Sequence, residues 1–337
     1  MNITFLIGNG FDLACNLKTK YTDVYKKYCI TDSPNDNIKK FKQSILEDDY
    51  KNWTDFEMAL PKFGKELNNF NDFSECVRDF SKFLEDYLNE EQNKIEIEQN
   101  KETLSNKMVR YIYRFYEFCL QDSKAVLKQL VEEPNENALC HFITFNYTDT
   151  LEKCLSTVKN SISRQNSTFY KYTRPLHIHG TLYNGILLGL DNEELYQDIP
   201  CEDIRKLRNL IDKVNINKRY SNINDQVLQI LQKSRIIVIF GWSMGESDSY
   251  WVASLKKLFS KNSNLHLVYA PYYSEATDIR FRNQSLDRED EQKDFIARKF
   301  EIPENYRNRV HIITNSEYMN LKFLVKTKDI DKELIAI

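Results

Sequence analysis

The sequence predicts an α/β protein in which a parallel sheet of about six strands is flanked by helices. Short runs rich in Ile, Val and Leu alternate with helical or polar stretches, and several of these runs end at glycine. Near-continuous apolar runs are typical of strands buried on both faces of a parallel sheet, and their alternation with helices indicates a layered architecture. The runs expected to form strands are 3–7, 139–145, 176–179, 185–190, 235–240, 265–270 and 309–314.

The chain opens with the order of elements that begins a doubly wound domain. Residues 3–7 form an apolar run that Gly8 closes, and a helix is expected to begin at Asp12 and to continue to Leu17. A strand, a glycine turn and a helix in this order predict that the first strand lies inside the sheet.

Residues 35–133 have a helical character. Apolar side chains recur at three- and four-residue spacing between Phe73 and Leu88, which predicts a long amphipathic helix. The pattern repeats between Val109 and Leu120, and no strand is expected before Ala138. We therefore expect a helical insertion over 35–133 in an α/β domain made of 1–34 and 134–337, with the polar tracts 156–173 and 273–292 as loops.

Composition excludes several classes of function. With 337 residues and 41% hydrophobic residues, the chain is long enough to bury a large core. A net charge of −3 argues against a dedicated nucleic-acid binder. No apolar run reaches the roughly 18 residues of a membrane span. The seven cysteines are scattered without a C-x-x-C pair, which favours free thiols in a reducing cytoplasm over a zinc site.

Glycine gives the clearest indication of a site. Seven of the eight glycines lie in three patches, at 8–10, 180–189 and 241–245, and each patch follows an apolar run. Glycine permits close backbone approach at a cost in chain entropy, and open α/β sheets bind ligands where strands give way to loops. The Gly8-Asn9-Gly10 turn is expected to present backbone N–H groups to a phosphate. Leu13 replaces the third glycine of the dinucleotide fingerprint.

Three acidic or amide side chains near these turns allow two interpretations each. Asp12 either compensates a helix N-terminus or reaches a ribose hydroxyl. Asn146 follows a strand and either orients a water or hydroxyl or, like Thr148, caps the helix that begins at Asp149. Asp248 follows Gly241 and Ser243, which offer donors to a phosphate or ribose, and it either belongs to that binding site or caps the next helix.

His177 and His179 are separated by one residue and would share one face of a strand. One of them could act as a general base near neutral pH. Both could bind a metal, with Asp191 as the nearest downstream acid and no third ligand defined. A buried neutral histidine and a capping contact would also explain the pair. In the Trp53–Glu57 segment, Thr54 or Asp55 is expected to begin a helix, which explains the segment without a function. A functional role for Glu57 is the more specific alternative.

Taken in order, these motifs resemble the AbiH family of bacteriophage abortive infection proteins. The resemblance runs from residue 1 to about 315, and the first motif is the most specific. The segments that carry it are Leu6–Ala14 with Leu17, Lys18, Thr19 and Tyr21, then Trp53–Glu57, Phe145–Thr148, His179-Gly180, and Gly241-Trp242-Ser243 with Asp248.

That family is in turn similar to sirtuin-like NAD-consuming defence effectors, which implies a Rossmann-like domain. The resemblance implies that Asn146 and His179 are the catalytic pair and that NAD is the substrate. Phe11 and Asp12 replace the serine that follows the sirtuin glycine turn, and the cysteine zinc module is absent, so simple NAD cleavage is favoured over protein deacylation. The residues expected to hold the dinucleotide are Gly8, Asn9, Gly10, Asp12, Gly241, Ser243 and Asp248.

The implied function is an anti-phage effector that hydrolyses NAD at the nicotinamide–ribose bond through an oxocarbenium-like state. A metal-dependent nuclease or phosphoesterase and a nucleotide-binding sensor without catalysis remain alternatives. NAD or a related nucleotide, a phage-derived trigger and a second copy of the chain are the expected partners. No metal, membrane or nucleic acid is expected, and segment 35–133 is expected to act as a lid or oligomer interface.

Overall fold

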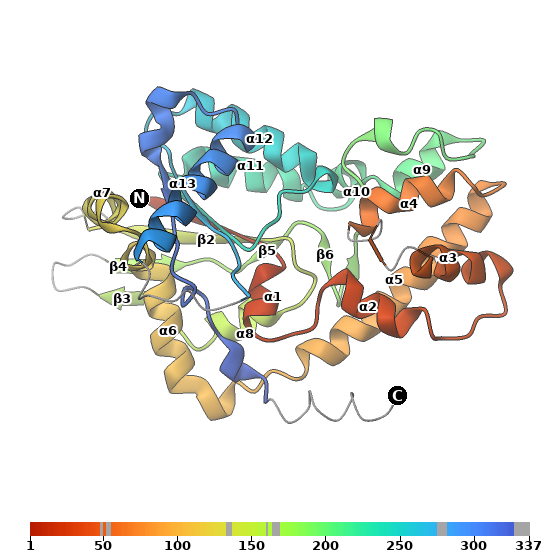
Figure 1. Cartoon of the computed structure of the whole chain (residues 1–337), viewed down its shortest axis with the longest axis horizontal. Coiled ribbons are helices and arrows are strands. Elements are labelled where there is room, and N and C mark those ends of the chain that lie inside the picture. The colour runs from red at the N-terminus through yellow and green to blue at the C-terminus, as the bar shows by residue number, and fades with distance from the viewer. Residues whose placement is uncertain are drawn as a thin grey trace.

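The computed structural model of the chain describes residues 1–47, 50–51, 55–132, 137–159, 161–163, 169–274 and 282–326. A mostly parallel sheet forms its centre in the order β10-β9-β8-β1-β2-β4-β3, with β5 beside β2 (Figure 1). Neighbours from β10 to β4 are parallel, which confirms the predicted α/β architecture, and β3 is antiparallel to β4. The strands are β1 (Asn2–Ile7), β2 (Ala138–Thr144), β3 (Ser161–Ser163), β4 (Phe169–Tyr172), β5 (Leu176–His177), β8 (Ile236–Phe240), β9 (His266–Ala270) and β10 (Val310–Ile312).

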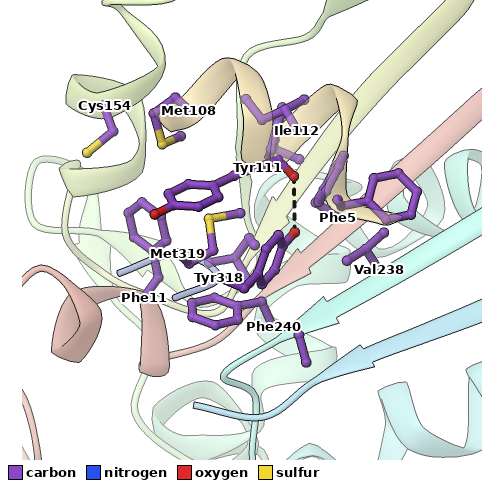
Figure 2. Close-up of a cluster of buried hydrophobic side chains, with 14 of the residues drawn as sticks. Phe5, Phe11, Met108, Tyr111, Ile112, Cys154, Val238, Phe240, Tyr318 and Met319 are labelled. Atoms are coloured by element: carbon purple, nitrogen blue, oxygen red, sulfur yellow. Dashed lines mark hydrogen bonds between the residues drawn. The ribbon is translucent and has the colours of Figure 1, made fainter. Parts of the chain in front are cut away.

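The central strands pack helices on both faces. Successive side chains of a strand point to opposite faces, so Phe5 of β1 enters one buried cluster and Leu6 enters another. Figure 2 shows part of the cluster that contains Phe5. The Phe5 ring stacks on Phe142 with 5.0 Å between centroids. In the same cluster the Tyr318 hydroxyl donates to the Tyr111 carbonyl at 3.2 Å. This face carries α1 (Gly10–Ala14), α6 (Lys101–Tyr113), α7 (Gln121–Val131) and α8 (Thr150–Leu155), and the other carries α11 (Ile223–Lys233), α12 (Ser249–Lys261) and α13 (Arg282–Lys299).

A group of helices forms the opposite end of the molecule from β3 and β4 (Figure 1). It has its own aromatic core, in which Phe56 and Phe80 stack with 4.2 Å between ring centroids. We call this group the helical end: α2 (Tyr21–Tyr28), α3 (Asp36–Leu46), α4 (Phe56–Gly64), α5 (Phe70–Gln92) and α9 (Ile204–Ile211), with α10 (Lys213–Tyr220) leading from it back to α11.

The predicted long helix between Phe73 and Leu88 is confirmed as part of α5. Residues 104–131 join the core of the sheet, whereas residues 38–88 pack with residues 188–211. The division of the chain into a domain of 1–34 and 134–337 and a helical insertion of 35–133 stays a prediction. Among the described residues, no helix is long and apolar enough to cross a bilayer, and all seven cysteines are free thiols.

Some expected elements are wrong. The run 185–190 contributes only β7 (Gly185–Ile186), which pairs with β6 (Gly180–Thr181) in a separate hairpin. Gly180, Gly185 and Gly189 have φ of +79°, +88° and +150°, which bend the chain out of a regular strand. Tract 156–173 contains β3 and β4, and tract 273–292 contains the start of α13. The helix expected to reach Leu120 ends at Tyr113, and a 3₁₀ turn follows at Phe115–Phe118.

Candidate functional site

A cavity of about 700 Å³ lies between the carboxyl ends of the central strands and the helical end. This volume is in the range of small-molecule sites, about 300–1,000 Å³, and carboxyl ends of strands are where open α/β sheets bind ligands. A second hollow of about 790 Å³, beside Arg235 and His266 at the other edge of the sheet, contains none of the predicted site residues. The first cavity contains all nine: Gly8, Asn9, Gly10, Asp12, Asn146, His179, Gly241, Ser243 and Asp248.

The loop after β1, residues 8–10, is packed closely against the loop after β8. Gly8 N–H donates to the Phe240 carbonyl and Gly10 N–H to the Gly241 carbonyl, both at 2.9 Å. A Cβ atom on Gly10 would lie 2.4 Å from the Cα of Gly241. The expectation that both N–H groups are open to a phosphate is therefore wrong. These glycines allow two backbones to approach each other.

Asn9 joins this first glycine loop to the segment that enters the helical end. Its side-chain NH₂ donates to the Thr19 carbonyl at 2.9 Å, and the Thr19 hydroxyl donates to its Oδ1 at 2.6 Å. The amide group of Asn9 is thus already engaged in holding the chain between α1 and α2, although the residue is exposed at the cavity.

The second glycine loop, residues 241–245, has open donors. Gly241 and Met244 have φ of +60° and +55°. The main-chain N–H groups of residues 242–245 donate to no acceptor in the described part of the chain, and Ser243 is exposed. Successive N–H groups around a left-handed residue form a concavity that binds anions. This loop is therefore a better candidate for binding a phosphate than residues 8–10 are.

Asp12 is buried on α1 beside the end of β2. The Thr148 hydroxyl donates to its Oδ2 at 2.8 Å, and its Oδ1 has no partner among the described residues. Burial raises the pKa of Asp12 to about 6, and the contacts from Thr148 and Asn146 oppose the rise. Neither Asn146 nor Thr148 caps α8, because Asp149 occupies that position without a side-chain bond, so the capping interpretation is wrong.

The two histidines do not share a face, because β5 ends at His177. His177 lies 2.6 Å from the Glu152 carboxylate and 2.8 Å from the Asn146 carbonyl. His179 is buried in the cavity wall, edge-on to the Phe145 ring. Desolvation and then the charge of Lys213 lower the pKa of His179, so the imidazole is neutral near neutral pH.

The residues proposed for a metal site have other partners. Asp191 accepts hydrogen bonds from the Ser249 hydroxyl and the Tyr250 N–H at the start of α12. His177 is paired with Glu152. Within the described ranges, no three His, Cys, Asp or Glu side chains gather as a metal-binding group. The arrangement required by the two-histidine hypothesis is not formed.

Asp248 connects the second glycine loop to His179. Its Oδ2 accepts from Trp242 Nε1 at 2.9 Å, and its Oδ1 lies 3.3 Å from Nε2 of His179. The Trp242 ring stacks on Phe145 with 4.3 Å between centroids. Asp248 stands at the N-terminus of α12 but makes no side-chain cap there, so its predicted capping role is wrong.

Lys213 and Glu57 complete a buried group of charges. Lys213 Nζ lies 3.3 Å from Glu57 Oε1 and 3.2 Å from Asp248 Oδ1. Burial raises the pKa of Glu57 to about 7, and the Lys213 charge opposes this shift. Burial would also raise the pKa of Asp248, but Lys213 and His179 hold it below its usual value. No motif marks Lys213 in the sequence, so sequence reasoning missed it.

The motif at Trp53–Glu57 is described in part. Asp55 caps α4 by accepting from the Met58 N–H at 3.2 Å, which confirms one of the two predicted caps. Glu57 faces the cavity. Trp53 and Thr54 lie outside the described residues.

Fold and cavity together define an α/β protein with a ligand-sized pocket at the carboxyl edge of its sheet. The sequence model of the family described as "Bacteriophage abortive infection AbiH" matches residues 4–269. The chain therefore belongs to the AbiH family, whose description links it to abortive infection. No match was found among curated proteins. The Rossmann-like assignment and the similarity to sirtuin-like NAD-consuming effectors stay predictions.

Proposed function

We propose that this AbiH protein acts in abortive infection by hydrolysing NAD in the cavity, at the bond between nicotinamide and ribose. The observation that carries the proposal is the meeting, in one cavity, of a buried neutral imidazole, an amide and a loop with open N–H donors. These are His179, Asn146 and residues 242–245. The likeness of the motif order to sirtuin-like effectors selects NAD among nucleotides.

The lining of the cavity fits the parts of a dinucleotide. The pyrophosphate would bind the N–H groups of residues 242–245 and the Ser243 hydroxyl. Asp12 lines the cavity, and its carboxylate would accept a hydrogen bond from a ribose hydroxyl. The stacked rings of Phe145 and Trp242 form an apolar wall beside His179. This wall would exclude bulk water from the bond that breaks.

Hydrolysis needs little covalent help from the protein. The C1′–N bond breaks heterolytically, and its electron pair neutralises the pyridinium nitrogen of nicotinamide. Water forms the new bond to the oxocarbenium-like C1′ and gives its proton to a base. Nε2 of His179, which lies 3.3 Å from Oδ1 of Asp248, would take this proton. The Asn146 amide would orient the ribose or the water.

The proposal is tested by incubating purified full-length protein with NAD and measuring nicotinamide and ADP-ribose. His179→Ala should lower turnover by about 100-fold or more, the usual contribution of a positioned acid–base group. Asn146→Ala should lower turnover by about 100-fold because the ribose or the water is misplaced. His266→Ala is the matched control, because His266 begins β9 at the other edge of the sheet. Thermal unfolding of each variant separates loss of function from loss of fold.

The trigger is tested in cells. The cellular NAD concentration should fall after phage infection in cells that carry the wild-type chain. It should stay constant in cells that carry His179→Ala. Size measurement before and after infection would detect assembly into a homo-oligomer. Saturable binding of ADP-ribose with no nicotinamide release, even during infection, would replace catalysis by a sensor role. Absence of both binding and turnover would overturn the proposal.

A further inference from the structure

Lys213 is a buried cation, and the carboxylates that pair with it belong to residues that line the cavity. The residue is 3% exposed, and its ammonium lies between the carboxylates of Glu57 and Asp248. Burying a lysine costs free energy unless it is paired and hydrogen-bonded. Hydrophobic residues of similar volume often stabilise a protein at least as well as a buried ion pair does. Stability alone is therefore a weak reason for a lysine at this position.

The backbone fixes Lys213 at this place. Its N–H donates to the Leu190 carbonyl at 2.9 Å, and the Leu190 N–H donates to the Ile211 carbonyl at 2.7 Å. A Cβ atom on Gly189 would lie 2.0 Å from that Ile211 oxygen, so only glycine allows the two segments to meet. Gly189 N–H also contacts Glu57 Oε1 at 3.3 Å. One backbone bridge thus brings the lysine and its first carboxylate together.

The contact continues from Lys213 to the imidazole. Oδ1 of Asp248 lies 3.2 Å from Lys213 Nζ and 3.3 Å from His179 Nε2. Oδ2 of the same carboxylate is held by Trp242. Asp248 is therefore fixed at both oxygens, and one of these oxygens faces the lysine and the histidine together.

We propose that Lys213 is a positioning residue for His179, acting through the Asp248 carboxylate that both side chains contact. Its role in catalysis rests on the proposed hydrolysis of NAD. Its role in setting the charge of the cavity wall does not.

The charged groups around this site determine what removal of the lysine does. His179 faces Asp248 and Lys213. The carboxyl groups of Asp55, which caps α4, and of Asp191 interact in turn with the charges of Lys213 and Asp248. Without the ammonium, the carboxylates of Glu57 and Asp248 have no cation between them. The His179–Asp248 pair then binds a proton at higher pH. His179, the proposed base, would then already carry a proton near neutral pH.

The first measurement follows the histidines by NMR in ¹⁵N-histidine-labelled protein, with His179→Ala to assign the signal. In Lys213→Met the titration midpoint of His179 should rise by about one pH unit or more, a tenfold change in proton affinity. Lys213→Arg should keep the midpoint near the wild-type value. Lys218→Met is the control, because Lys218 is exposed on the same helix. If the single variant does not fold, Lys213→Met combined with Glu57→Gln removes one of the two carboxylates that lose their cation.

The second measurement is the pH profile of kcat/KM for NAD. Its acidic limb should move to higher pH in Lys213→Met by the same amount, with kcat changed more than KM. An unchanged midpoint in Lys213→Met and in the double variant overturns the inference. A shifted midpoint in a protein whose wild type never cleaves NAD supports the positioning role and defeats the proposed function. The two failures are therefore distinguishable.

Discussion

The loops that follow β1 and β8 pack against each other at the carboxyl edge of the sheet, but they differ in how their N–H groups are used. Gly8 and Gly10 in the first loop donate their N–H groups to carbonyls of Phe240 and Gly241. Residues 242–245 in the second loop donate to no described acceptor. Both loops have paired glycines in the sequence. Glycine therefore serves close packing of backbone on one side and open donors on the other.

The side chains repeat this difference. In the first loop, Asn9 is bonded to Thr19, and nearby Asp12 is buried against Thr148. In the second loop, Ser243 is exposed. The first loop packs against the second, and the second is the loop to which we assign the phosphates of the proposed ligand. Substitutions in the two loops should separate these functions.

The largest expected effect comes from filling the contact between the loops. Gly10→Ala would place a Cβ atom 2.4 Å from the Gly241 Cα and 2.8 Å from the Tyr272 Cβ. Overpacking against backbone should lower the free energy of unfolding by about 3 kcal/mol or more. Denaturant unfolding measures this change, and a lowered affinity for ADP-ribose should accompany it because the second loop shifts.

Gly185→Ala is the control for this substitution. A Cβ atom there meets nothing within 4 Å, but φ is +88°. It should cost only about 1 kcal/mol of backbone strain. Equal losses for the two variants would mean that the loops are not packed as rigidly as their contact implies.

The next effect is a pH dependence of stability that Asp12 produces. Its pKa in the folded protein is about 6 against an ordinary 3.8, so the folded state binds the proton more tightly. Stability from this group is therefore full below about pH 4 and falls as the pH rises to about 6, by roughly 2–3 kcal/mol. Asp12→Asn should be more stable than wild type by about 2 kcal/mol at pH 7.

Most of that advantage should be lost at pH 4, where Asp12 is protonated in the folded state and about half protonated in the unfolded state. Denaturant unfolding at the two pH values gives the comparison. Asp287→Asn, a change at an exposed position of α13, is the control. A constant difference between Asp12→Asn and wild type would show that burial does not govern this carboxyl group.

The sequence predicted the sheet well where strands are central. The runs 3–7 and 235–240 differ from β1 and β8 by one residue, because strands buried on both faces are apolar throughout. The run 185–190 is equally apolar, but Leu188 and Leu190 pack into the helical end instead. Apolar content alone cannot specify which core a side chain joins. Positive φ at Gly185 and Gly189, which only tertiary structure reveals, decides against a strand.

The site was predictable in location more than in chemistry. Its nine predicted residues meet because strand ends of a parallel sheet meet at one edge. The partners of Gly10 come from a loop that is distant in sequence, so the loss of its free N–H was not predictable. Lys213 is 156 residues from Glu57 and 35 from Asp248. No local pattern identifies a residue whose function depends on such remote partners.

The smallest effects separate the two loops most sharply. Ser243→Ala should lower the affinity for ADP-ribose about fivefold, the value of about one hydrogen bond, and leave the unfolding free energy unchanged. Asn9→Ala should do the reverse, costing about 1 kcal/mol of stability through Thr19 and changing the affinity less than twofold. Calorimetry gives the affinity of each variant for ADP-ribose, and denaturant unfolding gives the unfolding free energy of each. If Asn9→Ala weakens binding more than Ser243→Ala does, the ligand contacts the first loop, and the open N–H groups of the second loop do not bind its phosphates.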